Sequence, residues 1–478
     1  MKPRELSTFA AWLPLATLVA CFAVGVTILG LGAELIVLAM LAAAAVAGVV
    51  AVRVGRTWDD VQRSTGEKFA SVLPVVLILL SIGMLIGSWV LSGTIPLLVV
   101  LGVRLVDPQF LVLTAFLVTA VMSLATGTSW GSAGTLGVAL MGTAAALDAP
   151  LAATAGAVVS GAYFGDKMSP LSDSTNVCAI GAGADLYAHI RHMLYTAVPS
   201  FALALAIYAV AGGRATPGGT LSDGTLPEGA LRLLRELDDV YALNALALLP
   251  LAVVIGGIVL RRPPALTLAA SSVLALVLGV AVQGFSVADA LAAAVRGFDV
   301  GMIATLGLDP ASTSELFVKL LARGGLYSMT DTLLVILAAF LLAGALDVSG
   351  ALDRIIAALL AAVRSTFGLI AATMGSGALL ISLTSHGGVT ALIVGELFQK
   401  AYAERRLAPE NLSRSLEDSV TIVEPLLPWT VSAVFMATTL GVPTVEYLPW
   451  AAFCFGGPVF SLLYAATFDR TGFGIKKT

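Results

Sequence analysis

Charged residues are scarce in this sequence, and their scarcity excludes an ordinary soluble protein. Of the 478 residues, 12% are charged and 58% are hydrophobic, and the mean hydropathy is +0.97. Soluble globular proteins carry about 25% charged residues. The apolar residues also stand in continuous runs, which excludes the alternating pattern of β-barrel strands. We therefore predict an all-α polytopic membrane protein surrounded by membrane lipid.

Cysteine and histidine are also rare, with three residues of each. Cys21, Cys178 and Cys454 lie far apart, so the sequence predicts no disulfide framework. A long basic tract and a zinc-type spacing are both missing, which argues against a nucleic-acid partner. The sequence contains no nucleophile–base motif and no sizeable soluble region, so we predict neither an enzyme nor a cofactor. Glycine, by contrast, is abundant, and 48 glycines are typical of closely packed membrane helices.

Basic residues predict how the chain lies in the membrane. Two apolar runs, Phe9–Leu31 and Glu34–Val52, are long enough to span it. The next segment, Arg53–Lys68, carries four basic residues against three acids, and we expect it to be a loop. Loops rich in Lys and Arg stay in the cytoplasm. The N-terminus lies two crossings earlier and contains Lys2 and Arg4, so we predict that it is cytoplasmic as well.

A polar segment near the middle divides the chain. Residues 212–239 combine Gly, Pro and Ser with clusters of charge. We interpret them as the loop between an N-terminal half, residues 1–211, and a C-terminal half, residues 240–478. At ~20 residues for each crossing, the apolar runs predict about 10–13 spans in all.

The most unusual stretch is Gly161–Asn176, which follows an apolar run. It contains three charged residues, among them Asp166 and Asp173, together with Pro170. A charge in hydrocarbon costs about 2.5–3.5 kcal/mol even on the mildest scale, and proline breaks a spanning helix. One interpretation is a polar loop between two spans. The other, which we adopt, is an ion site at a broken helix, because irregular backbone inside a membrane survives only beside protein or a wet cavity.

A second polar interruption precedes this stretch. Ala125–Gly134 is rich in glycine and hydroxyl residues, although it lies in the middle of an apolar region. Small and hydroxyl residues occur where a helix unwinds and also where two helices pack closely. The composition alone fits both interpretations.

The C-terminal half repeats both landmarks. The motif Thr128-Ser129-Trp130-Gly131 corresponds to Thr384-Ser385-His386-Gly387, and each motif opens an apolar stretch. In each half an acid then stands four residues before a proline, at Asp166 and at Glu424. The distance from the threonine to the acid is 38 residues in the first half and 40 in the second. Interrupted helices at corresponding places in two halves are typical of secondary transporters, which bind their substrate there.

The interruptions have the chemistry of a Na⁺ and H⁺ site. Hard cations bind carboxylate, carbonyl, amide and hydroxyl oxygens, and Asp166, Asp173 and Asn176 are the predicted metal ligands. Burial makes a carboxylate easier to protonate, so Na⁺ and H⁺ can compete for the same oxygens, and Lys167 can neutralise an acid when the cation is absent. The predicted ion- and proton-binding residues are Asp166, Asp173, Ser172, Thr175, Asn176, Thr128, Ser129, Ser132, Thr384, Ser385, His386 and Glu424. Of these, His386 and Glu424 can also carry a second proton or contact an organic substrate.

Two other polar segments have a more ordinary interpretation. His189 and His192 lie in Asp185–Met193, which has the pattern of an interfacial amphipathic helix. We expect surface histidines beside lipid headgroups rather than a pH sensor. Asp418 belongs to Arg414–Ser419, and a charge cluster at a helix end explains it at least as well as a site does.

The segments Phe164–Asp173 and His189–Tyr195 resemble the NhaC family of Na⁺/H⁺ antiporters. The similarity continues at Asn411–Ser419 and Phe435–Val442, and so spans most of the chain. This resemblance implies a fold like that of the ion transporter superfamily, with two inverted repeats, broken helices and re-entrant hairpins. It also implies a multi-pass protein of a bacterial-type inner (plasma) membrane, with Na⁺/H⁺ exchange as its activity and Na⁺ as the transported ion.

The same resemblance leaves a second function open. The family is similar to exchangers that couple Na⁺ and H⁺ to organic anions such as malate and lactate. The alternative is therefore a Na⁺- or H⁺-coupled carrier or exchanger of a small organic anion or amino acid. Because alternating access needs a scaffold that resists the movement of the ion-carrying unit, we also expect a homodimer.

Overall fold

The computed structural model of the chain describes residues 6–27, 34–214, 226–352, 354–355, 363–385 and 387–478. Within these residues all regular elements are helices, apart from an isolated bridge between Leu407 and Lys477. In this part of the chain eight helices are long and apolar enough to cross a membrane, or up to ten if each of two bent pairs forms one span. The prediction of a polytopic all-α membrane protein is confirmed, and the larger count equals the lower end of the predicted range.

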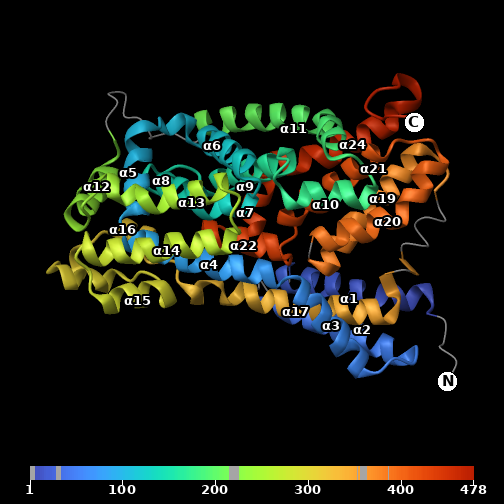
Figure 1. Cartoon of the computed structure of the whole chain (residues 1–478), viewed down its shortest axis with the longest axis horizontal. Coiled ribbons are helices and arrows are strands. Elements are labelled where there is room, and N and C mark those ends of the chain that lie inside the picture. Colours follow the sequence, from blue (N-terminus) through green and yellow to red (C-terminus); the bar gives the residue numbers. More distant parts are fainter. Residues whose placement is uncertain (1–5, 28–33, 215–225, 353, 356–362, 386) are drawn as a thin grey trace.

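The longer helices lie along the long axis of the molecule (Figure 1). The helices of the first half are α1 (Thr8–Thr27), α2 (Glu34–Arg53), α3 (Trp58–Ser71), α4 (Leu73–Leu91), α5 (Thr94–Leu105), η1 (Pro108–Phe110), α6 (Leu111–Thr126), α7 (Ser129–Ser132), η2 (Ala133–Gly137), α8 (Val138–Ala146), α9 (Leu151–Met168), α10 (Asp173–Ala182) and α11 (Leu186–Arg214). Those of the second half are α12 (Glu228–Val240), η3 (Ala245–Leu248), α13 (Leu249–Val259), α14 (Pro264–Ala281), α15 (Val287–Arg296), η4 (Val300–Leu306), η5 (Pro310–Ser312), α16 (Glu315–Leu321), η6 (Leu326–Met329), α17 (Thr330–Ser349), α19 (Thr366–Thr384), α20 (Gly387–Glu404), α21 (Pro409–Leu416), η7 (Glu417–Thr421), η8 (Glu424–Leu426), α22 (Val431–Leu440), α23 (Thr444–Tyr447), η9 (Leu448–Trp450) and α24 (Ala452–Thr471).

The stretch Ala125–Gly134 contains a break between two helices. α6 ends before Gly127, whose φ of 68° is a left-handed conformation that glycine adopts without strain. Thr128 then caps the next helix, because its hydroxyl accepts a hydrogen bond from the Gly131 N–H at 3.2 Å. Of the two interpretations that the composition allows, the structure shows the unwound one.

The stretch Gly161–Asn176 is broken in the same manner. Pro170 lies between the end of α9 and the start of α10. The hydroxyl of Ser172 accepts from the Thr175 N–H at 3.5 Å and so caps α10. The interruption is therefore a short irregular segment between two helices, as the proline predicts.

The second half has breaks at the corresponding places. Ser385, between α19 and α20, adopts a left-handed φ of 53°. Thr430 caps α22 by accepting from the Ala433 N–H at 3.3 Å. The order of breaks thus agrees with the repeat in the sequence. The inverted relation of the two halves and their division at residues 212–239 stay predictions.

The broken helices of the two halves pack against each other. α10 contacts α20, where the Gln399 side chain donates to the Gly181 carbonyl at 2.7 Å. α22 contacts η2 and α8, and Phe435 of α22 stacks on Trp130 of α7 with ring centroids 4.6 Å apart. These contacts bring the four breaks to one place, near the middle of the molecule (Figure 1).

The segment Arg53–Lys68, expected to be a loop, is mostly helical. α3 begins at Trp58, and Thr57 and Asp60 form a capping box at its start. The helix begins here for a local reason. In a capping box, each of two side chains accepts a hydrogen bond from the backbone N–H of the other residue, and these N–H groups have no partner inside the helix. Of the four basic residues, Arg63 and Lys68 therefore lie on an amphipathic helix that packs against α17, whereas Arg53 ends α2 and Arg56 lies in the turn between the two helices.

Close packing of α6 against α9 yields a first testable prediction. A Cβ atom at Gly161 would collide with the Thr119 hydroxyl and the Phe116 carbonyl. We expect Gly161→Ala to lower the free energy of unfolding by about 1–3 kcal/mol, measured as a lower unfolding temperature in detergent micelles. Gly375→Ala is the matched control, because nothing lies within 4 Å of its Cβ position. Equal unfolding temperatures for both variants would show that the approach of the helices does not depend on glycine.

Candidate functional site

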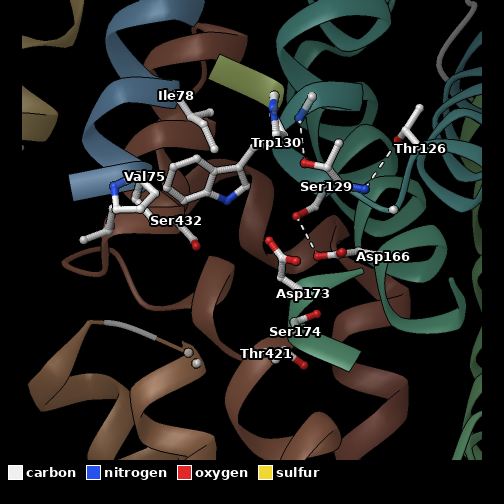
Figure 2. Close-up of a pocket in the computed structure, with 18 of the residues that line it drawn as sticks. Val75, Ile78, Thr126, Ser129, Trp130, Asp166, Asp173, Ser174, Thr421 and Ser432 are labelled. Carbon is white, nitrogen blue, oxygen red and sulfur yellow. Dashed lines mark hydrogen bonds between the residues drawn. The ribbon is translucent and has the colours of Figure 1, made fainter. Parts of the chain in front are cut away.

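The four helix breaks surround a cavity of about 580 Å³. Apolar residues of α4, α13 and α14 close one side of it, and polar residues of the breaks line the other. Figure 2 shows Asp166, Asp173 and Ser129 together beside the ring of Trp130. The predicted site residues that line the cavity are Thr128, Ser129, Asp166, Asp173, Ser385 and Glu424.

Asp166 is the best-connected of these residues. Its Oδ2 accepts a hydrogen bond from the Ser129 hydroxyl at 2.9 Å (Figure 2). Its Oδ1 accepts from the Ser172 hydroxyl at 2.6 Å. The side chain is half-buried and faces the cavity. It also stands in the last turn of α9, where the helix end carries partial negative charge and favours a cation. Ser129 and Ser172 belong to different breaks, so the Asp166 carboxylate links the two breaks through hydrogen bonds.

Asp173 lies across the break from Asp166, in the first turn of α10. It is exposed to the cavity, and the neighbouring Ser174 hydroxyl is 2.9 Å from that of Ser172. A carboxylate at a helix start is stabilised by the positive end of the helix dipole. The break therefore presents two carboxylates and the Ser174 hydroxyl to the same cavity.

Two predicted ligands face the backbone instead of the cavity. Thr175 Oγ1 donates to two carbonyls at the end of α9, at 3.0 and 3.1 Å. Asn176 Nδ2 donates to two carbonyls within the break, at 3.1 and 2.7 Å. Both side chains thus hold the irregular segment in shape, and their assignment as ion ligands stays a prediction.

Ser132 and Thr384 are also directed away from the cavity. Ser132 is buried and donates to the Thr128 carbonyl of its own helix at 2.9 Å. Thr384 is buried, and its hydroxyl is 2.6 Å from that of Thr390. His386, the remaining predicted residue, lies outside the described residues.

Glu424 brings a third carboxylate to the cavity, from the second half. Its Oε2 lies 3.0 Å from the position of a Cβ on Gly387, in the first turn of α20. The positive end of the α20 dipole stabilises negative charge at this position. Ser385 adds a buried hydroxyl that has no hydrogen-bond partner within the described residues, so its oxygen is available to a ligand.

Beside the cavity lies a buried ion pair that the sequence analysis did not find. Lys167 Nζ donates to Asp418 Oδ1, and the Thr196 hydroxyl is 3.3 Å from the same oxygen. Lys167 is 1% exposed and Asp418 is 0% exposed. Asp418 does lie at a helix end, because the π-helical turn η7 follows α21 directly, but the sequence analysis did not find its partner Lys167. A signal was present, because a lysine inside a span needs an acidic partner on another span.

The histidines of α11 are buried, so the expectation of surface histidines is wrong. His189 is 0% exposed and His192 is 6% exposed. His189 Nδ1 is 2.7 Å from the Ser413 hydroxyl, and His192 Nε2 is 3.1 Å from Asn411 Oδ1. The reason is that α11 continues as one long helix whose inner face packs on α21.

The site as a whole offers oxygen ligands. Three carboxylates and several hydroxyls line one cavity, between helix ends of both polarities. In the part of the chain that the structure describes, no group of three or more His, Cys, Asp or Glu is arranged to hold a metal. A hard monovalent cation coordinated by one or two carboxylates, hydroxyls and carbonyls fits this chemistry best.

A sequence profile of the Na⁺/H⁺ antiporter family matches residues 161–467. The chain belongs to this family. The match begins at the polar stretch that contains Asp166 and ends in α24, so it includes Asp173, Lys167, Asp418 and Glu424. The predicted family is confirmed.

Curated relatives cover nearly the full chain. An uncharacterized Na⁺/H⁺ antiporter of Haemophilus influenzae is 43% identical over 100% of this chain and 98% of its own length. The Na⁺/H⁺ antiporter NhaC of Alkalihalophilus pseudofirmus is 36% identical over 89% of this chain and 87% of its own. The arginine/ornithine antiporter ArcD of Halobacterium salinarum is 34% identical over 94% of this chain and 90% of its own.

Proposed function

We propose that this protein exchanges Na⁺ for H⁺ across the plasma membrane. The observation that carries the proposal is the Asp166 carboxylate, which is held by two serine hydroxyls between broken helices and is open to a cavity. Membership in the Na⁺/H⁺ antiporter family supports it, because the matched region begins at the stretch that contains this aspartate.

Exchange follows from competition for Asp166. The hydroxyls of Ser129 and Ser172 donate to the carboxylate. Each hydroxyl also has two lone pairs, so rotation turns the same oxygens toward a bound Na⁺. A proton on the carboxylate removes its charge and with it the attraction for the cation. Asp173 and Glu424 are further carboxylates in the same cavity and would tune this competition.

We infer that the cavity opens to the cytoplasm. Its lining includes the exposed Arg261 and Arg262, in the turn between α13 and α14, and Pro74 at the start of α4. The segment Arg53–Lys68, which carries four Lys and Arg residues, leads through α3 into α4, so two segments rich in Lys and Arg mark this side of the cavity as cytoplasmic. By the same argument the N-terminus is cytoplasmic. In alternating access this opening would close and the opposite end would open; the homodimer that would brace such a movement stays a prediction.

The size of the cavity supports a second candidate function. A volume of about 580 Å³ exceeds what a bare cation needs and falls within the about 300–1,000 Å³ of small-molecule sites. One relative is named an arginine/ornithine antiporter. In this alternative Na⁺ or H⁺ movement is coupled to a small organic anion or amino acid, which Glu424 and the start of α20 would contact.

Proton flux in proteoliposomes distinguishes the two functions. The purified protein is reconstituted with a pH-sensitive dye inside the vesicles, and Na⁺, Li⁺ and K⁺ are added in turn without any organic solute. Proton movement on addition of Na⁺ alone supports the antiporter. Movement that begins only when an amino acid or a carboxylate is added supports the coupled carrier instead.

Ser129→Ala provides a sharper test of the ion site. The variant loses one hydrogen bond to the Asp166 carboxylate, and such bonds to charged groups contribute about 1.5–3 kcal/mol. We therefore expect the Na⁺ concentration for half-maximal flux to change by about tenfold or more. Ser132→Ala is the matched control. Ser132 lies three residues after Ser129, and its hydroxyl donates to the Thr128 carbonyl of its own helix. An equal change in both variants would mean that Ser129 has no special contact with the ion.

A further inference from the structure

A second cavity, of about 970 Å³, lies at the other end of α22. Val431 and Ser432 at the start of this helix line the first cavity, whereas Thr438, Thr439 and Gly441 at its end line the second. Other walls come from α15, α16, η4 and η6, and α15 and α16 lie at the end of the molecule away from the N-terminus (Figure 1). The exchange mechanism above does not use this cavity.

Arg323 is the group in this cavity that most needs a partner. Its side chain is partly buried and forms no ion pair within the described residues. The Nη1 atom is buried and has no hydrogen-bond partner there. Nη2 lies 3.6 Å from the Cβ position of Gly441, at the C-terminal end of α22. The negative end of that helix dipole favours the charge but leaves Nη1 unsatisfied, and a buried unpaired charge is costly.

The backbone holds Arg323 in a fixed position. Gly324 and Gly325, which follow it, have φ of 83° and 82°. The Gly325 N–H donates to the Gly83 carbonyl of α4 at 2.6 Å, and a Cβ on Gly83 would lie 2.6 Å from the Gly325 carbonyl. Side chains at these positions would be strained or would clash. The backbone that carries Arg323 is therefore closely packed against α4.

The remaining charged groups of the cavity are largely paired already. Asp289 and Asp299 accept hydrogen bonds from hydroxyl or backbone donors near helix starts. Lys319 pairs with a glutamate of its own helix. Arg296 is exposed and, like Arg323, forms no ion pair in the described part of the chain. The hydroxyl of Thr439 is buried there without a partner as well, so the unsatisfied buried groups are the Arg323 guanidinium and this hydroxyl.

We propose that this second cavity binds a small carboxylate anion, with Arg323 as its main contact. The guanidinium is planar and donates two parallel hydrogen bonds to a carboxylate. Arg296 and Thr439 supply a second positive charge and a further hydrogen bond. The cavity is at the upper end of the size of small-molecule sites, about 300–1,000 Å³, so an organic acid of several carbons fits it. The proposal is independent of Na⁺/H⁺ exchange at the first cavity.

Thermal unfolding of the purified full-length protein tests this binding. Succinate, acetate and chloride are added as salts of one organic cation, at constant pH and ionic strength. Succinate is expected to raise the unfolding temperature in a saturable way, and chloride is not. Arg323→Gln is expected to weaken succinate binding about tenfold or more, because the variant loses the charge-assisted hydrogen bonds to the carboxylate. Lys319→Gln is the matched control on the same cavity, and its affinity is expected to match the wild type.

Three results would overturn the proposal. The first is the absence of saturable stabilisation by either carboxylate. The second is unchanged binding in Arg323→Gln. The third is loss of binding in Arg262→Gln instead, which would place the anion in the first cavity. If Arg323→Gln does not fold, Arg323→Lys keeps the charge without the planar fork, and Thr439→Val removes the hydroxyl; both are expected to weaken succinate binding.

Discussion

Asp166→Asn is expected to reduce Na⁺-driven proton movement in proteoliposomes to the level of empty vesicles. Asparagine is similar in shape to aspartate, so the hydroxyls of Ser129 and Ser172 keep a partner at distances near 2.9 and 2.6 Å. The variant has no negative charge to attract Na⁺, and its amide does not take up a proton at neutral pH. The binding of Na⁺ and the uptake of a proton are therefore both lost, whereas the fold is retained.

Two further variants complete this experiment. Asp59→Asn is the control, because Asp59 is an exposed acid of α3, far from the breaks in sequence. Asp173→Asn is expected to have a smaller effect, since this carboxylate is exposed at a helix start. Full activity of Asp166→Asn together with an inactive Asp173→Asn would show that Asp173, and not Asp166, carries the ion and the proton. Full activity of both would contradict the proposed ion site.

Breaking the Lys167–Asp418 pair is expected to be the most destabilising change in the chain. Lys167→Met or Asp418→Asn leaves an uncompensated charge in a fully buried place, and removal of one partner of such a pair costs about 3–5 kcal/mol. The double variant removes both charges of the pair, so we expect it to recover much of this loss. The pair joins α9, next to Asp166, to η7 of the other half, so its loss also disturbs the ion site.

Thermal unfolding of the two single variants and the double variant forms a double-mutant cycle. The exposed pair Lys400–Glu404 serves as the control, because surface pairs contribute about 0–1 kcal/mol. Lys400→Met is thus expected to unfold close to the wild-type temperature. If the losses of Lys167→Met and Asp418→Asn simply add in the double variant, the two charges do not depend on each other, and the prediction fails.

Much of the architecture was predictable, because helix formation in a membrane is decided locally. Every backbone N–H and C=O in lipid needs a partner within its own segment, so apolar runs become helices. Pro170 and Gly127 end helices for reasons contained in their own residue type. The order of the breaks in the two halves, and with it the transporter family, could thus be predicted from the sequence.

The contacts within the site could not be predicted in the same way. Ser129 and Ser132 are three residues apart and have the same side chain, yet only Ser129 bonds to Asp166. The difference is the direction of each side chain at a helix start, which depends on where Gly127 turns the chain. By residue type, Thr175 and Asn176 are equally plausible as ion ligands. In the structure the Thr175 hydroxyl and the Asn176 amide donate instead to the backbone carbonyls of Asp166 and Ser172.

By itself, the sequence determined the membrane class, the positions of the breaks and the carboxylates that stand in them. Only the tertiary structure decided that Asp418, 251 residues from Lys167, is its partner, and that His189 and His192 are buried. The physical reason is that lipid and protein interior are both apolar. The composition of a helix therefore predicts that its residues lie outside water. It does not predict whether a given face of the helix contacts lipid, a second helix or a buried charge.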